Sequence, residues 1–301
     1  MNKMFWLRTV RYTCALFCLI ICAVHNAIAD PLLWKVNAPK SESSSTIYLF
    51  GSIHFGVETM YPLPAKVVQA FDQSDYLAVE LNVLTLDPVL ASRAVLAQGL
   101  YQHGENLKDK LDPATWALLE GVAKQVGIPV ESFLPMRPWF VAIQLVSRQL
   151  LQAHFREDLG IDRYFLQRAA SEKPILELES LQGQLNAFAQ FSDDANALFL
   201  RQTLTEYEQG VLYLDALSTA WRNGNARQIE AIVFDIIDGS ETAQSIYDLL
   251  FTQRNRAMVA QIEDYFRAGQ NVFLVVGVGH MLGDDGLVTL LKKRGYQVET
   301  H

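Results

Sequence analysis

Cysteine is scarce in this chain and is confined to its first residues. The chain has 301 residues and three cysteines, Cys14, Cys18 and Cys22, all of which lie near its start. If that segment is removed, no thiol remains for a disulfide, a nucleophile or a thiolate metal ligand. Any metal bound by the remainder must then be held by histidine and carboxylate side chains.

Long apolar runs are also missing after the start of the chain. Lys3, Arg8 and Arg11 precede an apolar run over 14–24 and the small-residue triplet 27–29, which are the three regions of a cleavable secretion signal. The run is shorter than the roughly 20 residues that cross a bilayer, so an uncleaved anchor is the less favoured alternative. We expect cleavage between Ala29 and Asp30, a periplasmic or secreted product, and no stable membrane span after cleavage.

Basic residues are the minority. The chain has 25 of them against 33 acidic residues, and three basic but no acidic residues lie in the expected signal. The mature chain would therefore carry 22 basic and 33 acidic residues, a formal charge of −11. Nucleic acid is an unfavourable partner for such a chain. No linker interrupts it and half of the residues are apolar, so we expect residues 30–301 to form one domain.

Local patterns predict an α/β fold. Apolar and β-branched runs predict strands at 33–36, 46–50, 76–81, 174–178, 271–276 and 296–300. Helical periodicity predicts helices at 63–73, 88–98, 113–125, 138–154, 161–170, 195–207, 212–223, 227–237, 247–268 and 287–293. We therefore expect a central mixed sheet, formed by the N- and C-terminal parts of the chain, with a large helical insertion that can cover the sheet edge as a lid.

Two units with the same order of elements flank the helical part. In each, a strand runs into Gly-x-x-His, and a helix and a further strand with Tyr and Glu follow. The first unit contains Gly51, His54 and Glu80, and the second contains Gly277, His280 and Glu299. Such units are common in α/β proteins, so an internal repeat and a chance similarity stay equally open.

Histidine is scarce, yet two histidines occupy the same place. His54 and His280 each follow a strand and lie three residues after a glycine. Ligands of open α/β sheets collect beyond the carboxyl ends of the strands, and glycine lets the backbone turn close to a ligand. We expect both rings to face one cavity beside Gly51 and Gly277; the alternative is a pair of unrelated turn residues. No role is assigned to His103, His154 or His301.

Three glutamates follow strands. A carboxylate buried at a strand end needs a cation or a hydrogen-bond donor, so Glu80 is a candidate metal ligand or general acid or base, unless it simply reaches water. Glu177 and Glu179 flank Leu178 and point to opposite sides. Only one of them can face the site, and we favour Glu179.

Arginine offers a further candidate. A guanidinium at Arg137 would stabilise an oxyanion or orient a catalytic carboxylate. Arg254 and Arg256 are candidates for the same role, and their commoner fate is to pair with acidic residues on a long solvated helix.

Familiar hydrolase motifs are absent. The chain has no Gly-x-Ser-x-Gly elbow and no His-Glu-x-x-His. The remaining chemistry is a water molecule activated by a divalent metal on His54, Glu80 and His280, or by these residues directly as general bases. Zinc, manganese and cobalt suit such a donor set about equally.

Several segments together resemble one known family. They are Leu49–Gly56, Tyr76–Glu80, Arg137–Trp139, Lys173–Glu179, Arg254–Arg256 and Val276–Gly286. The chain is similar over nearly all of its mature part to the TraB/GumN family, which is related to Tiki metalloproteases and to erythromycin-esterase-like hydrolases. The resemblance implies that His54, Glu80 and His280 carry the family signature. The wider superfamily includes metal-dependent peptidases and haem-binding relatives.

We therefore expect a periplasmic hydrolase, with a divalent metal as cofactor, that cleaves a peptide or another amide or ester bond. A metal-independent reaction through the same residues is one alternative. The other is a binding protein without chemistry, which would hold a peptide, a haem or a polysaccharide-related ligand in the same cleft. The expected partner is thus a peptide or small molecule.

Overall fold

The computed structural model describes residues 31–39, 45–102, 104–234 and 239–301. The expected signal, its cleavage site and His103 lie outside the described residues. Within these ranges, no helix combines the length and the apolar character needed to cross a membrane.

A six-stranded mixed sheet forms the centre of the molecule, with strand order β4-β3-β5-β2-β1-β6. Strands β4, β3, β5 and β2 are parallel, whereas β1 is antiparallel to both β2 and β6. This confirms the expected mixed sheet built from both ends of the chain. The strands are β1 (Leu33–Asn37), β2 (Thr46–Ser52), β3 (Tyr76–Val79), β4 (Ile175–Glu177), β5 (Val272–Gly277) and β6 (Gln297–Thr300).

Strand β5 lies in the middle of the parallel part because its sequence is apolar on both faces. Residues 272–276 are all fully buried, as expected for a strand covered by helices on two sides. Val275 is aligned with Phe50 of β2 and with Val79 of β3. The three strands therefore end at the same edge of the sheet.

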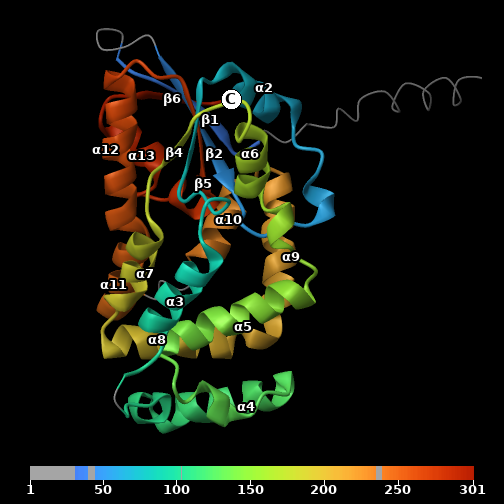
Figure 1. Ribbon diagram of the computed structural model, residues 1–301, viewed down its shortest axis with the longest axis vertical. Coiled ribbons are helices and arrows are strands. Elements are labelled where there is room, and N and C mark those ends of the chain that lie inside the picture. Colours follow the sequence, from blue (N-terminus) through green and yellow to red (C-terminus); the bar gives the residue numbers. More distant parts are fainter. Residues whose placement is uncertain (1–30, 40–44, 103, 235–238) are drawn as a thin grey trace, which may run out of the picture.

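Helices cover both faces of the sheet (Figure 1). On one side lie α2 (Ala65–Gln73), α6 (Ile161–Ala169) and α9 (Gly210–Arg222), and on the other lie α12 (Gln253–Arg267) and α13 (Leu287–Lys293).

An aromatic cluster joins the sheet to its first helical layer. The ring of Phe165 lies 4.8 Å from that of Phe273 and 5.2 Å from that of Phe71. Burial of each such side chain stabilises the fold by about 1.5–3 kcal/mol. The Trp221 indole donates a hydrogen bond to the Gly51 carbonyl at 2.7 Å, which ties α9 to β2 just before the first histidine motif.

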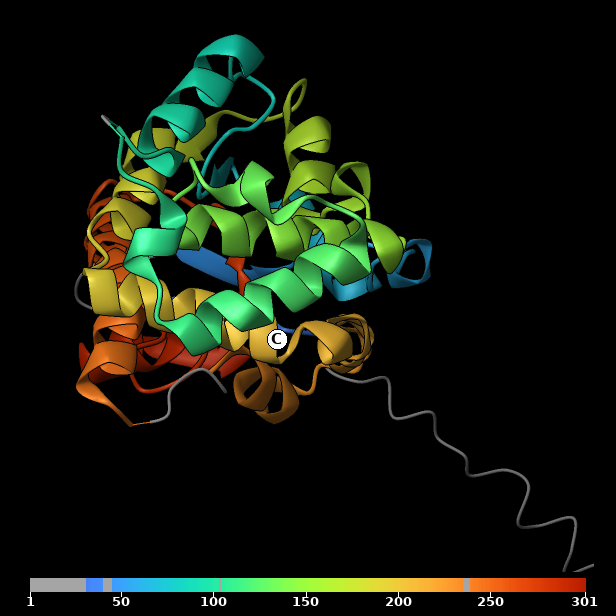
Figure 2. The ribbon, with the colours of Figure 1, turned by 90° about the horizontal axis from the view of Figure 1, so that it is seen from below.

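The central helical region lies beyond the carboxyl ends of the parallel strands (Figures 1 and 2). It has an apolar core of its own around Leu107, Leu119 and Val141. Asp87 and Asp112 cap two of its helices, each followed by proline in the first turn. Its helices are α3 (Pro88–Gly99), α4 (Pro113–Val126), α5 (Pro138–Gln152), α7 (Leu181–Ala189), α8 (Asp193–Thr205), α10 (Ala226–Val233) and α11 (Glu241–Tyr247).

The expected strands are present within one or two residues, and the helices differ more. Helix α7 (Leu-Gln-Gly-Gln-Leu-Asn-Ala-Phe-Ala) was not expected, although Leu, Gln and Ala favour helices and only its glycine disfavours one. The Ser180 hydroxyl caps it by accepting a hydrogen bond from the Gly183 amide, and Leu185 is buried. The helix expected at 247–268 begins at Glu241 and contains a π-helical segment, Asp248–Thr252.

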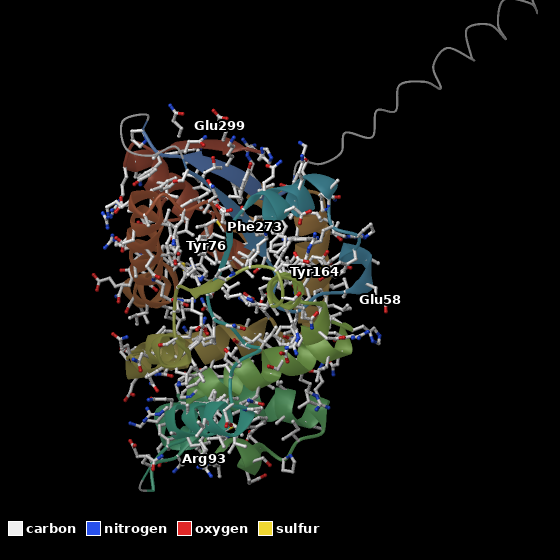
Figure 3. The ribbon with its side chains drawn as sticks, turned by 45° about the horizontal axis from the view of Figure 1, so that its top comes forward. Glu58, Tyr76, Arg93, Tyr164, Phe273 and Glu299 are labelled. Atoms are coloured by element: carbon white, nitrogen blue, oxygen red, sulfur yellow. The ribbon has the colours of Figure 1, made fainter. Side chains whose placement is uncertain are left out.

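The two similar units do not place their glutamates alike. One strand, β5, separates β2 from β3, whereas β2 and β1 separate β5 from β6. Glu80 is therefore buried beside central strands, while Glu299 lies opposite Lys35 on the exposed edge strand. Figure 3 shows Glu299 at the margin of the molecule and Phe273 in its interior.

Candidate active site

The carboxyl ends of the parallel strands bring three predicted residues together. His54 follows β2, Glu80 follows β3 and His280 follows β5. Glu80 Oε1 lies 3.9 Å from His54 Nε2, and Glu80 Oε2 lies 3.9 Å from His280 Nε2. The two imidazoles thus approach the same carboxylate from two different strands.

Gly277 lies where these three side chains converge. A Cβ at this position would lie 3.3 Å from both Glu80 Oε1 and His54 Nε2. The Gly277 amide donates a hydrogen bond to Glu80 Oε1 at 2.7 Å. Gly51 lies within β2 instead, and its carbonyl binds Trp221. Of the two predicted glycines, only Gly277 borders the three side chains.

Glu80 is ionised although only 6% of it is exposed. Burial raises the pKa of its carboxyl group, but the charges of His280, His54 and Arg254 and the Gly277 amide outweigh burial and lower the pKa to about 2. The site therefore holds a buried anion at neutral pH.

His280 is held in one tautomer by Asn255. Its Nδ1 lies 2.6 Å from Asn255 Oδ1, and the Asn255 amide group donates to the Asp285 carbonyl. Since Asn255 Oδ1 is an acceptor, Nδ1 carries the proton and the Nε2 lone pair faces Glu80. Burial lowers the pKa of His280 to about 4, so the ring is a neutral donor ligand or base.

His54 is held by Asp162, which belongs to the first turn of α6. The Nδ1 atom of His54 lies 3.2 Å from Asp162 Oδ1, and half of the side chain, 51%, is exposed. Partial burial lowers the pKa of His54, but the carboxylate of Asp162, helped by Glu80, outweighs it and raises the pKa to about 9. His54 therefore has a fixed orientation and access to solvent, and at neutral pH its Nε2 carries a proton that a metal ion would have to displace.

Glycine allows α6 to begin against the His54 loop. A Cβ at Gly160 would lie 2.2 Å from the His54 carbonyl oxygen, a distance that no other residue could accept without displacing the backbone. The Ile161 amide donates to the Ile53 carbonyl at 3.0 Å. These contacts bring Asp162 beside the ring of His54.

Arg254 joins two glutamates at the other side of the site. It binds Glu179 through Nε at 2.7 Å and Nη2 at 2.6 Å, and it binds Glu80 Oε2 through Nη2 at 2.8 Å. The expectation that Arg254 belongs to a solvated helix face is wrong, because its side chain is only 19% exposed. Arg256 is exposed. Glu179 reaches the site, whereas Glu177 accepts a hydrogen bond from the Asn82 amide.

Arg137 lies elsewhere, at the start of α5. Its guanidinium stacks over the ring of Tyr101 at 5.1 Å, and its amide donates to the Gly99 carbonyl. Among the described residues, no contact joins it to Glu80 or to either histidine. The local pattern cannot reveal this, since it does not specify which element packs beside the start of a helix.

The donor set fits a divalent cation in the type of its ligand atoms. Two imidazole Nε2 atoms and an ionised carboxylate are zinc-type ligands. An ion that forms bonds of about 2.1 Å can bind two ligand atoms that lie at most about 4.2 Å apart. Both observed separations, 3.9 Å, are wider than the roughly 3.4 Å that separates two ligands of a tetrahedral ion. Within the described ranges, no group of three or more His, Cys, Asp or Glu residues already has the spacing of a metal site. The side chains would have to move closer together to bind an ion.

Three residues of the site were not expected from the sequence: Asp162, Asn255 and Gln184, which donates to Glu80 and Glu179. The only available signal was that Asn255 stands between two arginines in a segment that resembles the family. Asp162 and Gln184 show no local pattern that separates them from ordinary helix-start residues.

Comparisons with known proteins relate the chain to one family. The family model for TraB/PrgY/gumN matches residues 32–300. "Uncharacterized protein YbaP" of Escherichia coli (strain K12) is 30% identical over 248 residues, which cover 81% of this chain and 87% of that protein. An uncharacterized protein of Treponema pallidum (strain Nichols) is 22% identical and covers 88% of this chain and 81% of its own.

A more distant similarity connects the chain with Tiki metalloproteases. "Metalloprotease TIKI1" of Danio rerio is 22% identical over 335 residues, which cover 90% of this chain and 66% of that protein. No solved structure matches the chain significantly. Since the family model extends over residues 32–300, which include both Gly-x-x-His motifs and all six strands of the sheet, the chain belongs to the TraB/PrgY/gumN family.

Proposed function

We propose that this protein is an exported, metal-dependent hydrolase that cleaves peptide bonds. The observation that carries the proposal is the convergence of two imidazole Nε2 atoms on a buried, ionised carboxylate, with the Nδ1 atom of each ring held by another side chain. This is the usual way in which proteins orient histidine ligands. The distant similarity to proteins named metalloproteases supports the same reading.

The residues of the site have different roles, which follow from their exposure and charge. His54, Glu80 and His280 would hold the cation, which when bound acts as a Lewis acid and lowers the pKa of a water molecule. Arg254 keeps Glu80 ionised and oriented, because it also binds Glu179 on its far side. Half-exposed His54 borders the cavity that a substrate would enter.

A direct experiment tests the proposal. The protein would be purified from the periplasm, its mass measured, its metal content determined by elemental analysis, and a broad peptide library incubated with it. We expect the mass of a chain that begins at Asp30 and about one divalent ion per chain. A chelator should stop cleavage, and zinc, manganese or cobalt should restore it. Peptide binding without any cleavage would instead favour a binding protein, and cleavage indifferent to the chelator would favour the metal-independent reaction.

Replacing Asn255 tests how His280 is held. Asn255→Ala should weaken metal binding about 10- to 100-fold, the usual cost of losing a group that orients a ligand. Asn255→Asp keeps an acceptor for His280 Nδ1 and should recover most of the affinity. Metal affinity would be measured by competition with a chelating dye, and the tautomer of His280 by nitrogen NMR. Wild-type affinity in Asn255→Ala would contradict this role.

A further inference from the structure

A cavity of about 290 Å³ opens beside His54 and Glu80. Part of its wall is the sheet itself, where Val79 and Val275 are neighbours in register. Phe55, Leu81 and Val83 add further apolar surface. An apolar group in this cavity would therefore contact side chains that gain from losing water.

The charged residues around the cavity are paired with opposite charges, although the buried Nε of Arg163 has no hydrogen-bond partner among the described residues. Glu157 binds Arg163 at 2.6 Å, and Asp162 lies beside His54. Glu80 is bound by Arg254. A charged substrate side chain entering the cavity would lose its water without gaining an unpaired counter-charge, which is unfavourable.

The volume limits what can enter. Ligand pockets of proteins usually measure about 300–1,000 Å³, so this cavity is at the lower end of that range. It has room for one side chain of the size of leucine or phenylalanine, and it is small for a large planar cofactor. Leu84, which follows Val83 in the chain, is exposed and does not line the cavity.

We propose that this cavity is the subsite for a single apolar side chain of the substrate, on the residue next to the bond that is cleaved. The inference rests on the proposed function and adds the substrate class: extended polypeptides with leucine, methionine or phenylalanine at that position. His54 Nε2 and Glu80 then lie beside the scissile bond while the cavity selects the residue.

A peptide series tests the subsite. Peptides that differ only in one residue, Leu, Phe, Gly, Asp or Lys, would be given to the metal-loaded protein. Their binding would be measured by calorimetry and their cleavage by mass spectrometry. We expect kcat/KM for the leucine and phenylalanine peptides to exceed that for the charged peptides by at least about 10- to 200-fold, the range set by a single methylene group in an apolar pocket.

Two variants link the preference to the cavity. Val83→Trp fills it and should lower kcat/KM for the leucine peptide at least about tenfold, with the glycine peptide unaffected. Leu84→Trp is the matched control, because Leu84 is the exposed neighbour outside the lining. If Val83→Trp does not fold, Phe55→Ala, which enlarges the cavity, should shift the preference from leucine to phenylalanine.

The outcomes separate the two proposals. Cleavage at equal rates for all five peptides would overturn the subsite and leave the hydrolase. Selective binding of apolar peptides without cleavage would support the subsite and overturn the hydrolase. A chain that neither binds nor cleaves any of them would overturn both.

Discussion

Glu80→Gln is expected to abolish peptide cleavage while leaving the protein folded. Glutamine has the same shape and can still accept the Gly277 amide hydrogen bond, but it lacks the charge on which both histidines converge. We expect kcat/KM to fall by about 10²–10⁴-fold, the range for a positioned acid, base or ligand group, and metal content to fall with it. Turnover, elemental analysis and circular dichroism would be measured on the same preparation.

The chain supplies a matched control for this change. Glu299 holds the corresponding position in the second Gly-x-x-His unit, but it lies on the exposed edge strand, so Glu299→Gln should be silent. The double change His54→Ala with His280→Ala should be scarcely worse than either single change, because residues that act as a unit are not additive. A folded Glu80→Gln protein with wild-type turnover and metal content would return Glu80 to a structural role.

Arg254→Met is expected to cause the largest loss of stability. It leaves the side chains of Glu80 and Glu179, 7% and 11% exposed, without their shared cation. Removing one partner of a buried ion pair costs about 3–5 kcal/mol. Arg256→Met is the control on the same helix, since Arg256 is exposed, and surface changes usually stay within about 0.5 kcal/mol. Urea denaturation at pH 7 would give both free energies of unfolding.

The same variant has a pH signature. The pKa of Glu80 in the folded protein, about 2, lies below its ordinary 4.5. Its stabilising contribution is therefore fully present above about pH 4.5 and is lost as the pH falls toward 2. Without Arg254 the pKa of the Glu80 carboxyl group rises, so the variant has less stability to lose as the pH falls. The difference in the free energy of unfolding between wild type and Arg254→Met should therefore become smaller as the pH falls from 4.5 toward 2. A gap that is constant with pH would show that Arg254 acts through packing alone.

The local sequence is sufficient to predict the strands and the positions of the two histidine motifs after them. A continuous apolar run such as 272–276 suits a strand inside a covered sheet, and glycine after it lets the chain turn. Because the parallel strands end at one edge, residues after them meet, which is why His54, Glu80, Glu179 and His280 could be anticipated as neighbours. This reasoning depends on the period of side chains along a strand, a property of consecutive residues.

Only the tertiary structure decided which groups hold those side chains. Arg254 stands 174 positions from Glu80 and belongs to a helix whose pattern also suits a solvated face. Asp162 reaches His54 because α6 begins against the first loop, and Arg137 is absent from the site because α5 begins beside Tyr101. Hydrogen bonds and ion pairs act over a few ångströms, so they depend on strand order and helix docking, which hydrophobic periodicity does not encode. The sequence thus determined the strand ends and their histidines, and packing between distant segments determined their partners, charges and access to solvent.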